Sequence, residues 1–297
     1  MKVTVIINPT AGRGRALRLL PRVEKTLVES GQDFTVRVSQ SPEDPPRLAR
    51  EAIAAGAQMI VAGGGDGTSQ MVAGALVGSQ TILGILPLGR GNDFARGLGI
   101  PKDPLAACRI LTEGTIRDID IGHVGQDKIY LNMAGAGFDG EATSRANRLP
   151  IKGAFAYFLS VFLTLVSFRP VTFTLEHDRG SWKGKAMMIG VANSTTYGGG
   201  MRLAPDAKVD DGLFDLVIIK EVGKLEFVRV FPRVYQGTHI LHPAVEVLRT
   251  TGVQMACSAP FDLYADGDRM APLPLRLEVV PRALRVMTPP QKAASFS

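Results

Sequence analysis

Residues 59–77 read MIVAGGGDGTSQMVAGALV and place the segment GGGDGT, at Gly63–Thr68, between an apolar run and a helical pattern. We predict a strand over Met59–Ala62 and a helix over Ser69–Val77. The glycines leave bare backbone at the end of the strand, which is the edge of an open α/β sheet where ligands bind. A tight turn alone rarely needs so many glycines, so the segment indicates a functional loop in an α/β sheet.

The pattern around this loop repeats strand and helix, with short connections, over about the first 120 residues. Glycines at Gly31, Gly56, Gly78 and Gly114 follow predicted helices, where a left-handed residue commonly ends a helix. Alternation of this kind favours a parallel sheet with helices on both faces. The other predicted strands are Val3–Ile7, Phe34–Ser39 and Thr81–Leu86, and the other helices are Arg15–Glu29, Arg47–Ala55 and Pro104–Thr112.

Two further loops follow strands of this predicted sheet. Asn8–Gly14 (NPTAGRG) precedes a helix, and its glycines suit a phosphate, although a plain turn explains the segment equally well. Pro87–Arg96 (PLGRGNDFAR) also follows a strand and therefore faces the same edge as Gly63–Thr68. In the GGGDGT loop, Asp66 can lie near a metal or a hydroxyl, and Thr68 can donate to a phosphate or cap the helix.

From about Asp118 the sequence shows period-two alternation and β-branched residues, which favours an antiparallel sandwich. Two predicted helices, Gly153–Phe168 and Leu225–Tyr235, interrupt it. We expect an α/β domain over 1–120, a β-sandwich domain over 121–290 whose last strand could return to the first domain, and a loose tail at 291–297. The predicted strands are Lys128–Met133, Val171–His177, Lys185–Asn193, Phe214–Ile219, Val245–Cys257, Phe261–Tyr264 and Leu275–Val280.

The predicted helix Gly153–Phe168 (GAFAYFLSVFLTLVSF) carries no charge, but its 16 residues are too few to span a bilayer. Ser160, Thr164 and Ser167 recur at helical spacing and mark a thin polar stripe on one face. A buried helix is the favoured interpretation, and a helix that touches a membrane is the alternative. We expect no secretory signal, because the first residues lead directly into an apolar strand.

The 297 residues are 45% hydrophobic and 21% charged, which excludes general disorder and suits two globular domains. A net charge of +6 suits an anionic partner such as a nucleotide or acidic lipid head groups. The basic residues are dispersed and aromatic residues make up only 6%, so we expect no nucleic-acid partner. Cys108 and Cys257 have no paired spacing, which predicts a reducing cytoplasm.

Several other motifs carry less information. Gly135–Gly140 matches G-x-G-x-x-G, yet no acidic residue follows about 20 positions later, so close backbone packing explains it better. Ala204–Asp215 gathers four carboxylates that could hold a hard cation, although a solvated acidic turn is favoured on spacing alone. Asp266-Gly267-Asp268 suits a general base or a hairpin loop. The chain has no Walker A pattern, and its four histidines lack metal-ligand spacing.

Taken together, these segments resemble the diacylglycerol kinase catalytic family, including its small soluble lipid kinases. The match follows the order of the whole chain. GGDGT by itself is shared with NAD kinases, whereas the later segments select lipid kinases. The matching segments are NPTAG at 8–12, GGGDGT at 63–68, PLGRGNDFAR at 87–96, DID at 118–120, APDAKVDDGLFDL at 204–216 and ADGD at 265–268.

The resemblance implies a nucleotide domain, a β-sandwich domain and a cleft between them, with ATP as the phosphoryl donor and Mg²⁺ as cofactor. Asp268 and Asp66 are the implied catalytic residues, Asp268 as proton acceptor and Asp66 in an acidic network with Asp93 and Asp120. The implied nucleotide-binding residues are Asn8, Pro9, Thr10, Ala11, Gly12, Ser39, Gly64, Gly65, Asp66, Gly67, Thr68 and Arg90. The implied magnesium ligands are Asp211 and the backbone carbonyls of Lys208 and Leu213.

Two positions depart from the family, which usually has threonine at Arg90 and glutamate at Asp268. Arginine can still pair with phosphate, and aspartate can still accept a proton. We therefore expect ATP-dependent phosphorylation of a membrane-lipid hydroxyl, on diacylglycerol, phosphatidylglycerol or a sphingoid-like lipid. The alternatives are a catalytically impaired nucleotide-binding regulator and an NAD-kinase-like enzyme for small molecules.

The expected location is the cytoplasm, with peripheral contact at the inner membrane face, and a homodimer is compatible with the sequence. Basic residues beside an apolar helix favour such a contact, because they attract anionic lipids. The residues expected to make it are Arg145, Arg148, Lys152 and Arg169.

Overall fold

The computed structural model describes residues 1–151 and 154–290, and the chain divides into two compact units. Unit 1 comprises Met1–Ile119 and residues 282–290, and unit 2 comprises Asp120–Pro281. The predicted tail at 291–297 and Lys152, an expected membrane contact, lie outside the described residues.

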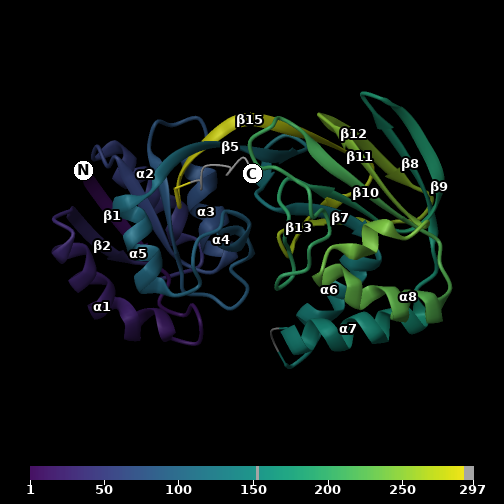
Figure 1. Cartoon of the computed structure of the whole chain (residues 1–297), viewed down its shortest axis with the longest axis horizontal. Helices are drawn as coiled ribbons and strands as arrows, with labels where there is room; N and C mark the ends of the chain where they lie inside the picture. The colour runs from purple at the N-terminus through teal and green to yellow at the C-terminus, as the bar shows by residue number, and fades with distance from the viewer. Residues whose placement is uncertain (152–153, 291–297) are drawn as a thin grey trace, which may run out of the picture. The chain divides into compact units, whose positions relative to one another are not determined.

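Unit 1 contains a parallel sheet in the order β2–β1–β3–β4, and the end of β15 pairs with β4 through Val286 and Leu83 (Figure 1). Every residue of β3 and β4 is buried, as expected for parallel strands covered on both faces. This confirms the α/β class. The strands are β1 (Lys2–Ile7), β2 (Asp33–Val38), β3 (Met59–Gly64), β4 (Ile82–Pro87) and β15 (Leu275–Thr288).

The helices of unit 1 begin and end at residues with local reasons to do so. At the start of α5, the Asp103 carboxylate accepts from the Ala106 N–H at 2.9 Å and Pro104 takes the first helical position. Gly31 and Gly56 follow α1 and α2 in the left-handed conformation, at φ of 69° and 77°. The helices are α1 (Arg15–Glu29), α2 (Asp44–Ala54), α3 (Asp66–Leu76), α4 (Asp93–Gly97) and α5 (Pro104–Glu113).

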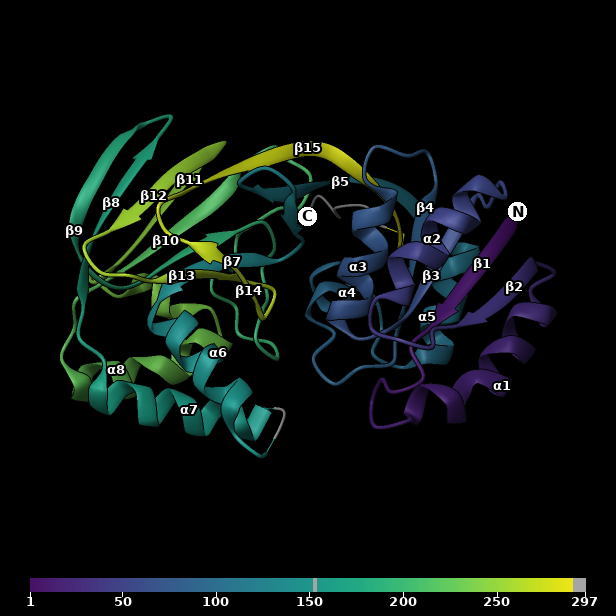
Figure 2. The same ribbon diagram turned by 180° about the vertical axis from the view of Figure 1, so that it is seen from behind.

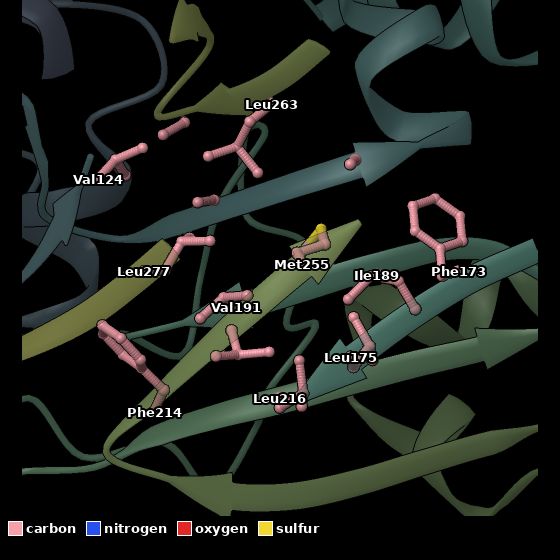
Figure 3. Packing of buried hydrophobic residues seen from close by; sticks show 14 of the residues in the cluster. Val124, Phe173, Leu175, Ile189, Val191, Phe214, Leu216, Met255, Leu263 and Leu277 are labelled. Carbon is pink, nitrogen blue, oxygen red and sulfur yellow. The ribbon is translucent and has the colours of Figure 1, made fainter. Parts of the chain in front are cut away.

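Unit 2 is the predicted β-sandwich, and the pairings among β7 to β14 are antiparallel. Figure 3 shows its core, where Val191, Met255, Leu216 and Leu277 from different strands converge. The remaining strands are β5 (Thr115–Val124), β6 (Lys128–Tyr130), β7 (Met133–Gly137), β8 (Val171–His177), β9 (Gly180–Ala192), β10 (Phe214–Lys220), β11 (Val245–Thr250), β12 (Gly252–Cys257), β13 (Asp262–Ala265) and β14 (Asp268–Pro272).

Unit 2 also carries helices that form a second apolar cluster, in which Phe138 and Phe168 meet edge to face with ring centroids 5.4 Å apart. The sequence analysis missed α6. Figure 2 shows α6, α7 and α8 gathered along one side of the unit. No helix among the described residues is long and apolar enough to cross a membrane. The helices are α6 (Phe138–Arg148), α7 (Ala154–Ser167), α8 (Lys224–Val230), η1 (Phe231–Tyr235) and η2 (Thr238–Leu241).

Two predicted strands of unit 2 are each broken in the structure. The predicted strand Lys128–Met133 divides into β6 and β7, because the N–H groups of residues 131–133 turn toward the Asp266 carboxylate. The predicted strand Val245–Cys257 divides into β11 and β12 at Thr251, whose N–H and hydroxyl donate to Asp178 Oδ2 at 3.0 and 3.1 Å. In both places a carboxylate distant in sequence accepts the hydrogen bonds that would continue the strand.

The interpretation of the apolar helix as buried also needs correction, because α7 is only half-buried over residues 159–167. Two residues of its predicted polar stripe, Ser160 and Thr164, are fully buried, whereas the third, Ser167, is exposed. Phe162, Leu163 and Val166 are exposed as well. Val161 and Leu165 are buried beside the two hydroxyls, so α7 has apolar side chains on both its inward and its exposed face.

Candidate active site

Three loops meet at the carboxyl edge of the unit 1 sheet. The Asn8 backbone N–H donates to Gly63 O at 2.9 Å, and its side-chain amide donates to Thr68 Oγ1 at 3.1 Å. The N–H groups of Leu88 and Gly89 both donate to Gly64 O, at 2.8 and 2.9 Å. The loops that the sequence analysis placed at one edge are therefore joined directly by hydrogen bonds.

Glycine is required at several points of these loops because backbones approach closely. A Cβ at Gly89 would overlap Gly65 Cα, one at Gly64 would overlap Thr68, and one at Gly12 would strike Leu88 O. Gly67 differs, since apart from its chain neighbours and the backbone of its own helix no described atom lies within 4 Å of a Cβ built there. Its position in the first turn of α3 leaves open space beside a helix N-terminus, which fits a phosphate group.

Asp66 and Asp93 lie close together in this edge, because an oxygen of each carboxylate is within 3.5 Å of the position that a Cβ on Gly91 would take. Asp66 Oδ1 accepts from the Phe94 N–H at 3.0 Å, while Asp93 pairs with Arg96. Burial raises the pKa of the Asp66 carboxyl, and the negative charge of Asp93 adds to that rise. A cation held near Asp66 would favour its ionised form.

A small pocket of about 140 Å³ opens beside the first loop. Asn8 Oδ1 shapes its wall by accepting from the Thr10 N–H and hydroxyl at 3.0 and 2.8 Å. Ser39 lines it from the end of β2, where its N–H donates to Ile7 O at 2.9 Å. The predicted residues Asn8 to Thr10 and Ser39 are thus brought together, and Arg90 is exposed in the loop after β4. The pocket lining consists of Asn8, Pro9, Thr10, Ser39, Gln40, Ser41, Pro42 and Met71.

Asp120, the third member of the implied acidic network, is buried in unit 2. Its Oδ2 accepts from the Gly212 N–H at 2.6 Å, and its own N–H donates to Val209 O at 2.6 Å. Its backbone carbonyl accepts from Asn193 Nδ2 at 2.9 Å. Asp120 therefore holds the turn that carries the implied magnesium ligands.

The implied metal turn contains an arginine that the sequence analysis missed. Asp211 Oδ1 accepts from the Leu213 N–H at 3.2 Å, and its Oδ2 forms an ion pair with Arg249. Arg249 also stands directly opposite Asp215 in the β10–β11 pairing. Among the described residues, no group of three or more His, Cys, Asp or Glu side chains could hold a metal. One carboxylate and two carbonyls, at Lys208 and Leu213, remain the available donors.

The surroundings of the Asp215 carboxylate indicate that a cation can bind at this turn. Its buried Oδ2 has no hydrogen-bond partner among the described residues. Burial raises the pKa of Asp215 to about 6; Arg249 opposes the rise, and the charges of Asp211 and Asp206 add to it. The unpartnered Asp215 oxygen and the other oxygen donors of the turn fit Mg²⁺ or Ca²⁺, with Arg249 as a competing cation at Asp211. The metal would share the turn with the Arg249 guanidinium or displace it from Asp211.

The two carboxylates of the ADGD turn differ in their surroundings. The Asp266 carboxylate accepts from the N–H groups of Leu131, Asn132 and Met133 at 2.7, 3.0 and 3.1 Å. Asp268 is exposed, yet the surrounding protein raises the pKa of its carboxyl by desolvation. Asp266 thus shapes the backbone, and Asp268 remains able to accept a proton.

Unit 2 contains an apolar pocket that the sequence analysis did not identify. α8 and η1 line it with Phe227, Val230, Phe231 and Val234, and Asp139 at the start of α6 is one of its few polar residues. Tyr197 donates its hydroxyl to Asp139 Oδ1 at 3.3 Å. The signal for α6 was present in acidic residues of its first turn and basic residues of its last, which suit the helix dipole.

The G-x-G-x-x-G segment at Gly135–Gly140 was attributed to close backbone packing, and Gly137 shows such packing. It adopts φ of 100°, and a Cβ there would lie 2.6 Å from Met187 O. Gly137 ends β7, which is antiparallel to β9, unlike the parallel strand of a dinucleotide fold. Close backbone packing is therefore confirmed as the reason for this glycine.

Comparison with known proteins agrees with this organisation. Residues 2–124 match the family model of the diacylglycerol kinase catalytic domain, and residues 132–288 match the YegS C-terminal NAD kinase beta sandwich-like domain. A diacylglycerol kinase of Mycobacterium tuberculosis (strain H37Rv) is 33% identical over 296 residues, covering 97% of this chain and 95% of that protein. One of Bacillus subtilis (strain 168) is 32% identical over 300 residues, covering 98% of each.

A solved structure supports the same fold. The crystal structure of a diacylglycerol kinase from Bacillus anthracis str. Sterne superposes with a TM-score of 0.77 at 20% identity, covering 97% of this chain and 96% of that one. The family models together span most of the chain, and the curated relatives align along nearly all of it. The chain therefore belongs to the diacylglycerol kinase catalytic-domain family of lipid kinases, and it is a kinase.

Proposed function

We propose that this kinase transfers the γ-phosphoryl group of ATP to a hydroxyl of a membrane lipid. The apolar pocket of unit 2 carries the choice of acceptor, because aromatic and aliphatic side chains form most of its lining. A hydrocarbon chain suits such a lining. The acceptor of an NAD kinase is polar, and its hydroxyl groups would find few hydrogen-bond partners in this pocket. The names of the curated relatives make diacylglycerol the first acceptor to test.

The donor nucleotide is assigned to the carboxyl edge of the unit 1 sheet. The residues Asn8 to Gly12 and Gly64 to Thr68 would surround its phosphates, and the open space at Gly67, beside the N-terminus of α3, supports this assignment. Ser39 would lie near the nucleotide, and Arg90 would add a cation for a phosphate oxygen. When bound, Mg²⁺ supplies neutralising charge to the phosphate oxygens.

Asp268 is the proposed proton acceptor. The acceptor oxygen forms a bond to the γ-phosphorus as the bond to the ADP oxygen breaks, and the hydroxyl proton passes to the Asp268 carboxylate. A raised pKa suits this role, because it makes the carboxylate a stronger base. The cytoplasmic face of a membrane is the proposed place of action, since ATP and a lipid hydroxyl can meet there.

Incubation with γ-labelled ATP and a total lipid extract tests the proposal. The expected product is a labelled phospholipid, identified by chromatography and mass spectrometry, with NAD as a parallel acceptor. Label on NAD alone would replace the proposal by a small-molecule kinase. ATP binding without label on any acceptor would instead favour a nucleotide-binding regulator.

A further inference from the structure

The exposed face of α7 presents hydrocarbon to solvent. Val166 has a side chain 75% exposed, and Phe162 and Leu163 are exposed beside it. Ser160 and Thr164 are buried on the opposite side. Val161 and Leu165 pack inward and anchor the helix, so its burial is explained, but a second apolar group still faces water, and such an exposed group indicates a partner.

A second exposed apolar group lies on α8 and η2. Leu225 is 86% exposed and Leu241 is 81% exposed. With Val166, these are the three most exposed large hydrophobic side chains in the described part of the chain. Scattered exposed hydrophobic residues are normal, but three from separate elements of one unit indicate a surface with a partner.

Contacts made by neighbouring residues link the segments that carry these three residues. Lys224 Nζ, next to Leu225, donates to Val166 O at 2.5 Å. Glu226, on the other side of Leu225, lies 3.1 Å from His242 Nε2, which follows Leu241. Figures 1 and 2 both show α7 and α8 side by side at the same border of unit 2. We call Val166, Leu225, Val228 and Leu241 the docking surface.

Positively charged residues lie on or next to the elements that carry the docking surface. Arg169, Arg229 and Arg233 are exposed and pair with no carboxylate among the described residues. The segment from Lys224 to Leu241 contains three Lys or Arg residues and one acidic residue, Glu226. Exposed apolar groups beside unpaired cations are complementary to an anionic lipid bilayer.

We propose that the docking surface binds an anionic phospholipid bilayer, with Val166, Leu225 and Leu241 entering the boundary between head groups and acyl chains. The inference rests on the lipid-kinase function and specifies where that function meets its membrane. α8 has one face in this surface and lines the apolar pocket with Phe227 and Val230. A lipid leaving the bilayer would therefore meet the element that covers the pocket.

A second copy of the chain is the competing occupant of this surface. Self-association of the same patch would bring Arg229 and Arg233 of both copies together, and like charges repel. A bilayer containing acidic lipids has no such penalty. The charge of the patch thus favours the membrane over a homodimer.

Co-sedimentation of the full chain with sucrose-loaded vesicles, without ATP, tests the proposal independently of catalysis. Binding is expected to vesicles of phosphatidylcholine with phosphatidylglycerol, and to weaken as salt rises. The double substitution Leu225→Glu and Leu241→Glu should weaken binding about tenfold or more, because both side chains leave the interface. Arg229→Gln with Arg233→Gln should reduce the preference for anionic over neutral vesicles.

The control is Val28→Glu, which removes a side chain 65% exposed on α1 of unit 1. It should leave vesicle binding unchanged, and all variants should keep the wild-type Tm. Wild-type binding by the Leu225→Glu, Leu241→Glu protein would overturn the proposal. So would loss of a dimer in that variant, by light scattering, with vesicle binding intact. Failure of the kinase assay alone would affect neither result.

Discussion

The side-chain amide of Asn8 donates to Thr68 Oγ1 at 3.1 Å, which joins the loop after β1 to the first turn of α3. Thr68→Val should weaken ATP binding about 2- to 12-fold, the range of one hydrogen bond worth about 0.5–1.5 kcal/mol. Valine keeps the shape of the side chain and removes only the hydroxyl. Titration calorimetry with ATP measures the effect.

Thr26→Val is the matched control, since among the described residues that hydroxyl bonds only to Arg22 O, on the exposed side of α1. It should bind ATP like the wild type. Equal ATP affinity in both variants would mean that the Asn8–Thr68 contact does not hold the nucleotide loops.

Substitutions of Arg90, in the loop after β4, test whether this departure from the family affects ATP binding. If its guanidinium pairs with an ATP phosphate, Arg90→Ala should raise the KM for ATP by about tenfold, the effect of one charge-assisted hydrogen bond. Arg90→Thr should recover part of that loss by restoring the usual family residue. Wild-type steady-state kinetics in both variants would show that Arg90 points away from the nucleotide.

Asp268→Asn should lower kcat by about 10²- to 10⁴-fold, the usual contribution of a general base, while ATP still binds. Asp268→Glu should retain activity. Because desolvation raises the pKa of Asp268, the acid limb of the kcat profile should lie above that of an ordinary aspartate. Kinetics from pH 4 to 8 with a lipid acceptor measure both effects.

Stability separates Asp268 from its neighbour. A carboxyl whose folded-state pKa is raised stabilises the fold at low pH and loses that contribution as pH rises, so Asp268→Asn should not lower Tm at pH 7. Asp266→Asn should lower Tm, because one acceptor oxygen of the three N–H bonds becomes a donor. An inactive Asp266→Asn protein with normal Tm would reverse the two assignments.

The Arg249–Asp211 ion pair sets up a test of the proposed Mg²⁺ site. Asp211→Ala should abolish metal at this turn and lower Tm. Arg249→Met should strengthen metal binding, because the competing cation is removed while the aliphatic bulk remains. Elemental analysis and Tm with Mg²⁺ or EDTA provide the measurements. Identical metal content and EDTA response in wild type, Asp211→Ala and Arg249→Met would exclude this turn as the site.

Local sequence patterns were sufficient to predict the α/β layer. The buried runs of β3 and β4 and the glycines after α1 and α2 act over a few residues, so their meaning can be read without the fold. The strand breaks at residues 131–132 and at Thr251 depend on Asp266 and Asp178, each more than 70 residues away in sequence. Such contacts exist only after the strands have paired.

In the functional regions, too, local patterns could be predicted from the sequence, whereas contacts between residues distant in sequence could not. Loops after parallel strands must share an edge, which is why the contact of Asn8 with Thr68 agrees with the sequence analysis. Arg249 was missed because only the β10–β11 register places it opposite Asp215. The inward orientation of Ser160 and Thr164 was missed because helical spacing defines a stripe and not the side to which it turns.

The course of β15 has a consequence for how the protein is made. Its first half pairs with β12 in unit 2, and its last residues pair with β4 in unit 1. During translation the β4 edge therefore emerges from the ribosome about 200 residues before its partner Val286. An uncovered strand edge recruits other strands, so the nascent chain passes through a period of exposure to aggregation. A gene fragment ending at residue 119 would make that exposure permanent.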